Sequence, residues 1–135
     1  FDPVQLKDQK AFGFYLRAEI PVGEVYSREA KRQLYSGLAI IKQKLELKHL
    51  AGIYLDVDIL DNLDRPAYLQ MKKDMVEGRF KRLFVLDEKS IMGSPNADHD
   101  LLRHYLQVGG FELFTCKHGE CLPLDISATL LCLAA

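Results

Sequence analysis

The chain has 135 residues, of which 48% are apolar, and its formal net charge is −1. This length suits one domain with a substantial core, and the near-neutral charge excludes the strong overall basic charge of many nucleic-acid-binding proteins. No apolar run approaches the roughly 20 residues that span a membrane, and the first ten residues lack the features of a signal peptide. We therefore expect a cytoplasmic protein with no membrane association.

The cysteines and the two ends of the sequence bear on its organisation. Three cysteines, an odd number, argue against a disulfide framework. The sequence begins without Met and ends on the apolar stretch ISATLLCLAA, and exposed apolar surface invites partners. We expect a fragment of a longer protein in which residues 1–10 are disordered, 11–122 form one domain and 123–135 begin a further helix.

The first half of the chain alternates between strand and helix patterns. Residues 11–18 are rich in aromatics and predict a strand. Leucine and isoleucine at helical spacing predict an amphipathic helix over 28–47, with Ser27 as its N-cap. Residues 51–57 predict a second strand.

The second half continues the alternation. Pro66 suits the first turn of a helix and Gly78 suits its end. The remaining elements, in order, are a strand over 80–86, a helix from Ser94 that Gly109 and Gly110 end, and a strand over 111–115. This alternation predicts an α/β fold with three αβα layers and a mainly parallel sheet of four to five strands.

Charged residues follow three of the predicted strands. In open parallel sheets, ligands bind beyond the carboxyl ends of the strands. The strands end at Arg17–Glu19, at Asp56–Asp58 and at Asp87–Lys89. We therefore expect Asp87 to lie at a functional site, close to Arg17 and Glu19.

Two sets of residues have the composition of a metal site. Glu19, Asp56 and Asp87 supply the oxygen ligands that Mg²⁺ prefers, although acids at strand ends also cap helices and face water. Cys116, His118 and Cys121 are residue types that bind zinc. A structural zinc site needs a fourth ligand, so an ordinary loop remains the alternative.

Catalysis by a serine nucleophile is a third possibility. It needs a serine with an activating partner, and the nearest candidates are Ser27, Ser90 and Ser94. Each of them also fits a helix cap or a turn. The glycine-rich phosphate-binding motifs are absent from the sequence.

Several segments, taken in order, match one family pattern. Tyr15–Glu19 is similar to a Y-x-R-V-S strand, and Ser27–Lys31 is similar to an S-x-x-x-Q helix start. Asp64–Met71 is similar to D-R-P-x-L-x-x-M, and Asp87–Ile91 is similar to D-R-L-S/G-R. Over residues 11–135 the chain resembles the catalytic domain of the serine recombinases, the resolvase/invertase family.

The resemblance implies a resolvase-like fold and an activity on DNA. In that family a serine attacks the scissile phosphate without a metal, and arginines stabilise the charge that develops. The resemblance further implies no cofactor, DNA contact through a segment beyond Ala135, and a homodimer or tetramer held by the helix that begins at 123–135.

Several of the family's site residues are replaced in this sequence. The resemblance places Arg17 and Arg65 at phosphate-binding positions and Asp87 at the acid of the third motif. Substitutions stand at the other matched positions: Glu19 for the nucleophilic serine, Lys31 for the helix glutamine, and Glu88 and Ile91 for two arginines.

These replacements make the charge of the matched site unfavourable for a phosphodiester. Two unit charges about 4 Å apart interact by roughly 4 kcal/mol at an effective dielectric constant near 20. We therefore expect a degenerate recombinase domain that does not cleave DNA. Two alternatives stay open: an active recombinase that uses Ser27 or Ser90, and an α/β domain that binds a metal or a small phosphorylated ligand at the same edge.

Overall fold

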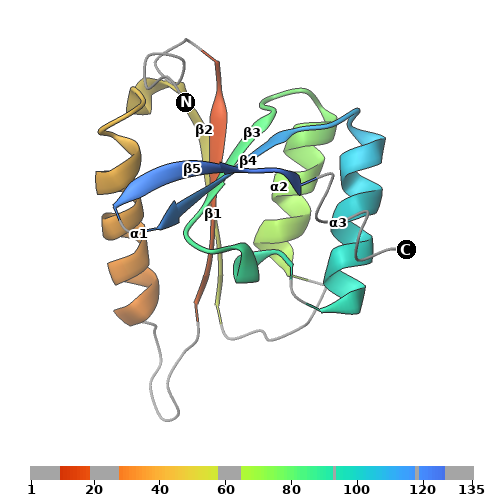
Figure 1. Cartoon of the computed structure of the whole chain (residues 1–135), viewed down its shortest axis with the longest axis horizontal. Coiled ribbons are helices and arrows are strands. Elements are labelled where there is room, and N and C mark those ends of the chain that lie inside the picture. The colour runs from red at the N-terminus through yellow and green to blue at the C-terminus, as the bar shows by residue number, and fades with distance from the viewer. Residues whose placement is uncertain (1–9, 19–27, 58–64, 93, 118, 127–135) are drawn as a thin grey trace.

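A computed structural model describes residues 10–18, 28–57, 65–92, 94–117 and 119–126. Its centre is a five-stranded sheet with the strand order β2-β1-β3-β4-β5 (Figure 1). The strands are β1 (Phe12–Ala18), β2 (Leu50–Val57), β3 (Arg82–Val85), β4 (Glu112–Lys117) and β5 (Glu120–Leu124). The first four are parallel, and β5 is antiparallel to β4.

Helices cover both faces of this sheet. The helix α1 (Arg28–Ile41) packs on one face, and α2 (Pro66–Val76) and α3 (Pro95–Gln107) pack on the other (Figure 1). Two short 3-10 helices, η2 (Leu47–His49) and η3 (Glu88–Ser90), precede β2 and follow β3. The α/β class, the three layers and the mainly parallel sheet predicted from the sequence are confirmed.

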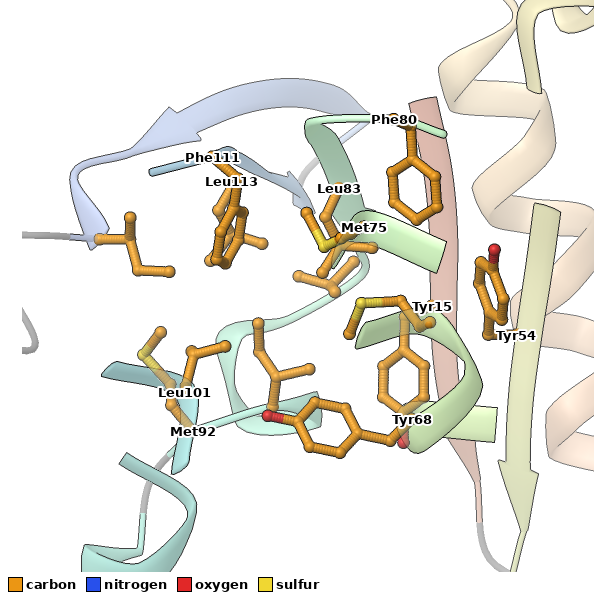
Figure 2. Close-up of a cluster of buried hydrophobic side chains, with 14 residues drawn as sticks. Tyr15, Tyr54, Tyr68, Met75, Phe80, Leu83, Met92, Leu101, Phe111 and Leu113 are labelled. Carbon is orange, nitrogen blue, oxygen red and sulfur yellow. The ribbon is translucent and has the colours of Figure 1, made fainter. Parts of the chain in front are cut away.

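Alternating residues of β1 build two separate cores. Phe12, Phe14 and Leu16 pack in the core beneath α1, because successive side chains of a strand point to opposite faces. Tyr15 points into the other core, where it lies against Tyr68 of α2 (Figure 2). The central strand is therefore buried on both sides, as expected for a parallel sheet.

The first helix is shorter than predicted: the sequence predicted a helix over 28–47, and α1 ends at Ile41. The amides of Lys44 and Leu45 both donate to the carbonyl of Ile41, which tightens the last turn. Leu45 still reaches the core beneath α1. The apolar spacing that predicted a longer helix thus reflects a buried residue in the turn that follows it.

The end of the described chain is a hairpin that the sequence did not predict. Gly119 has a φ of +75°, a conformation that suits glycine in a tight turn. The turn allows β5 to pair with β4 as far as Leu124, two residues beyond the expected domain end at 122. Ile126 is buried in the core beneath α2 and α3, and most of the helix expected over 123–135 lies outside the described residues.

Within the described residues, no helix is both long and apolar enough to cross a membrane.

Substituting Gly37 by alanine tests how closely α1 approaches the sheet. A Cβ atom at Gly37 would lie 2.2 Å from Cζ of the fully buried Phe14, so Phe14 must shift within a packed core. We expect the G37A variant to lose about 1–2 kcal/mol of unfolding free energy in urea denaturation, despite the better helix propensity of alanine. The exposed neighbour Ser36 gives the control, since S36A adds no contact. Equal stability of the two variants would contradict this packing.

His104 makes the stability of the fold depend on pH. This side chain is buried, with Nε2 3.3 Å from Sδ of Met75. Burial lowers the pKa of His104 from 6.5 to about 4, with Lys72 acting in the same direction and Asp100 opposing it. The unfolded chain therefore binds a proton at a higher pH than the folded chain, and the stability contributed by neutral His104 is lost as the pH falls from about 6.5 to about 4.

We expect the unfolding free energy to fall by about 2 kcal/mol between roughly pH 7 and pH 4.5, measured by urea denaturation. The H104L variant should lose most of this dependence. The carboxyl group of Asp74 changes the unfolding free energy at lower pH values, because its hydrogen bond from Tyr54 holds its pKa below 3.8. If the unfolding free energy of H104L depends on pH as strongly as that of the unchanged protein, groups other than His104 cause the dependence.

Candidate functional site at the carboxyl edge of the sheet

The carboxyl ends of β1, β2 and β3 meet at one edge, as the predicted parallel sheet requires. In the register of the sheet, Arg17 of β1 lies beside Asp56 of β2, and Tyr15 lies beside Val85 of β3. The helix α2 begins at the same edge, because Asp56 contacts its first turn. Two of the described residues that were predicted for the site, Asp56 and Arg65, are connected by hydrogen bonds to the hydroxyl of Tyr15.

Asp56 is a buried acceptor at the end of β2, with only 4% of its surface exposed. Its carboxylate accepts hydrogen bonds from the Tyr15 hydroxyl at 2.8 Å and from the amides of Ala67 and Tyr68, each at 2.9 Å. These amides belong to the first turn of α2, where backbone donors have no partner within the helix. Asp56 therefore caps α2 from a neighbouring strand, and its negative charge is favourable at that end of the helix.

This capping changes what the start of α2 can bind. Free amides at a helix N-terminus form a common anion site. Here Asp56 already occupies two of them, and the side chain of Arg65, at the N-cap position, makes no capping hydrogen bond. An incoming phosphate would have to compete with a carboxylate of the protein for these donors.

Arg65 is enclosed by the protein and is 2% exposed. Its Nη1 donates to the Tyr15 hydroxyl at 3.0 Å and to the Ser90 carbonyl at 2.8 Å. The guanidinium carbon lies 4.5 Å from the ring centroid of Tyr68 and 5.7 Å from that of Tyr15, distances at which cation–π attraction is favourable. Nε of Arg65 is buried without a hydrogen-bond partner in the described part of the chain.

Tyr15 joins the acid to the arginine. Its hydroxyl donates to Asp56 and accepts from Arg65. Burial raises the pKa of Tyr15, the cation of Arg65 opposes this, and the hydrogen bond to Asp56 adds to it. Tyr15 therefore stays a neutral phenol, which is the form that can donate to a carboxylate.

The same group of side chains extends to α3 through Tyr68. The Tyr68 hydroxyl donates to Asp100 at 3.0 Å, and Nζ of Lys72 lies 2.7 Å from the same oxygen. Burial raises the pKa of Tyr68, with the charge of Asp100 adding to the effect. The edge of the sheet is thus tied to both helices on this face.

The third predicted motif follows β3 and is mainly structural in the described contacts. Oδ1 of Asp87 accepts from the Lys89 amide at 2.9 Å and caps η3. Glu88 is half-buried, whereas Ile91 is fully buried in the core beneath α2 and α3. The position that the resemblance compares with an arginine therefore lies inside the apolar core here.

Other predicted site residues have separate outcomes. Ser94 accepts a hydrogen bond from the Ala97 amide and caps α3, as the alternative interpretation expected. Glu19 and Ser27 lie outside the described residues, so their positions stay predictions. Within the described ranges, no group of three or more acidic, histidine or cysteine side chains could hold a metal. These ranges do not include Glu19, which belongs to the predicted magnesium set, or His118, which belongs to the predicted zinc set.

Sequence reasoning missed the part that Tyr15 and Tyr68 take in this site. Tyr15 was considered as the start of the matched strand, and Tyr68 as part of the matched segment Asp64–Met71. The available signal was the acid at position 56, on the same strand face as the buried Tyr54. A charged residue at a buried strand position requires partners, and the start of the following helix was a source of them.

Comparisons with known proteins bear on the fold. No protein-family model and no curated protein match the sequence. Among solved structures, the chain is similar to the crystal structure of the N-terminal catalytic domain of TP901-1 integrase, with a TM-score of 0.58 and 13% sequence identity. The match covers 90% of this chain and 91% of that chain. The chain therefore shares the fold of that integrase catalytic domain, and at this identity the likeness concerns the fold alone.

Replacing Asp56 tests its capping and linking role. The D56N variant keeps the shape of the side chain but puts an amide group among three hydrogen-bond donors. We expect a loss of about 3 kcal/mol of unfolding free energy in urea denaturation. D87N is the comparison, because the acid at this half-buried cap is expected to contribute about 1 kcal/mol or less. If D56N and D87N lose similar amounts of unfolding free energy, Asp56 does not have the capping and linking role described here.

Proposed function

We propose that this chain is a serine-recombinase-like domain that acts in DNA recombination as an assembly or regulatory partner and does not itself cleave DNA. The similarity to the TP901-1 integrase domain supports the fold. The order of the matched segments from Tyr15 to Ile91 supports the family. Glu19 at the position of the nucleophile supports the loss of cleavage, because a carboxylate is a poor substitute for a serine alkoxide.

The enclosure of Arg65 is the observation that carries this proposal. Arginine binds phosphate best when its planar guanidinium presents two N–H groups to two oxygens. In this chain Nη1 of Arg65 already donates to Tyr15 and Ser90, and the side chain is 2% exposed. A phosphodiester would have to displace these contacts, so Arg65 is better placed to support the fold than to hold a substrate.

The charge at the matched sequence positions supports the same proposal. Glu19 and Glu88 bring two carboxylates to matched positions where the family pattern has a serine and an arginine. The buried Ile91 supplies no replacement charge. The proposed domain therefore repels a phosphate where an active recombinase would attract one.

The partners in this proposal follow from the resemblance. DNA would be bound mainly through a segment beyond Ala135. A homodimer or tetramer would form through the helix proposed for 123–135. The resemblance implies no cofactor for this role.

Binding and cleavage can be measured separately on the full-length protein with the DNA that flanks its own gene. We expect salt-dependent binding in a mobility-shift assay and no strand breaks on a denaturing gel. The E88R variant should bind this DNA about three- to tenfold more tightly at low salt, because it replaces a negative charge near the phosphates with a positive one. Ile91 is left unchanged, since an arginine at this fully buried position would be an unpaired charge in the core.

The matched control is E77R, which makes the same charge change at the far end of α2, where Glu77 is exposed. Equal gains in E88R and E77R would argue against a phosphate-facing edge. Strand breaks that disappear in S27A or S90A would replace the proposal with an active recombinase. Absence of DNA binding, together with thermal stabilisation by Mg²⁺ that D87A removes, would favour the small-ligand alternative.

A further inference from the structure

Two cysteines face each other across the hairpin of β4 and β5. Cys116 and Cys121 are directly paired in the antiparallel register, and their sulfur atoms lie 3.5 Å apart. Both side chains are buried, with exposed fractions of 5% and 2%, and both are free thiols in this structure. They belong to the core beneath α1, away from the group around Arg65.

The backbone geometry at this pair suits a disulfide. Directly opposite residues of antiparallel strands have Cα atoms about 4.5–5.5 Å apart, within the roughly 4.4–6.8 Å range of disulfide-linked residues. The sulfur atoms would have to approach from 3.5 Å to about 2.05 Å, which rotation about the Cα–Cβ bonds can provide. Any backbone adjustment would fall on β5, which lies at the end of the sheet order.

The two thiols differ in acidity. The hydrogen bond with Cys121 and burial raise the pKa of Cys116, so it remains a thiol. The hydrogen bond with Cys116 lowers the pKa of Cys121, burial opposes this, and the charge of Lys44 adds to the lowering. The thiolate is the nucleophile in disulfide exchange, so its lowered pKa favours Cys121 as the attacking sulfur.

We propose that Cys116 and Cys121 form a reversible disulfide that links β4 to β5, a modification site independent of the proposed recombinase function. The oxidant is a low-molecular-weight disulfide. The Cys121 thiolate attacks one of its sulfurs, forms a mixed disulfide and releases one thiolate, which takes the proton of Cys116. The Cys116 thiolate then attacks Sγ of Cys121 and releases the second small thiolate, which takes a proton from water.

This exchange is balanced and has a structural consequence. Two protein thiols are oxidised to one disulfide, and the small disulfide is reduced to two thiols. The new bond would fasten β5, which pairs with β4 at the end of the sheet and leads to Ile126 in the opposite core. Opening of this hairpin, the step that exposes the buried Cys121, would then be suppressed.

The test uses the full chain carrying C132S, which removes the third cysteine. The protein is equilibrated in glutathione buffers of graded redox potential, and its free thiols are then alkylated under denaturing conditions. Trypsin cleaves after Lys117 and separates the two cysteines, so that only a disulfide can keep their peptides together in mass spectrometry. We expect both thiols to disappear together and the linked peptides to appear, and excess reduced glutathione to reverse the change.

Variants distinguish this reaction from unrelated oxidation. C116S should stop at a mixed disulfide between Cys121 and glutathione, and neither C116S nor C121S should give linked peptides. K44M should slow oxidation severalfold, and K42M, at an exposed lysine nearby, should not.

Two results would overturn the proposal. The first is independent modification of Cys116 and Cys121 without a linked product. The second is protection of both thiols that ends when a metal chelator is added, which would show a metal site instead.

Discussion

The fold depends at its carboxyl edge on one buried carboxylate. Asp56 accepts hydrogen bonds from the Tyr15 hydroxyl and from two amides of α2, and so joins β1, β2 and the following helix. A buried charge is tolerated only when such donors compensate for its lost hydration. Tyr15 in turn accepts from Arg65, which reaches the Ser90 carbonyl after β3. The relative positions of three strands and one helix therefore depend on a single connected group of polar side chains.

Under the proposed function, this arrangement explains why Arg65 does not hold a phosphate. The side chain of Arg65 lies against two tyrosine rings and is hardly exposed, so its charge is compensated within the protein. The acid at the end of β3 caps η3, and the position of Ile91 belongs to the core. In the account proposed here, positions that the family uses for DNA chemistry have become supports for the fold.

The sequence predicted the architecture well because parallel strands and amphipathic helices have distinct periodicities. It did not predict β5, because ECLPL is short, contains a proline and follows an ordinary strand; only its pairing with β4 makes it a strand. Asp56 was predicted to lie at the site, but its hydrogen-bond partners come from 41 residues before it and 11 and 12 residues after it. Such contacts depend on the packing of separate segments, which no local pattern contains.

The central claim is that Arg65 is a structural group enclosed by the protein, and nuclear magnetic resonance of its side chain tests this most directly. The Nε–Hε signal of Arg65, assigned by its loss in R65K, would be followed in the full-length protein while a short duplex of the DNA that flanks its own gene is added. The account predicts a signal that exchanges slowly with water and does not move at saturating DNA. A fast-exchanging signal that shifts with DNA would show that Arg65 contacts phosphate, and would contradict the account.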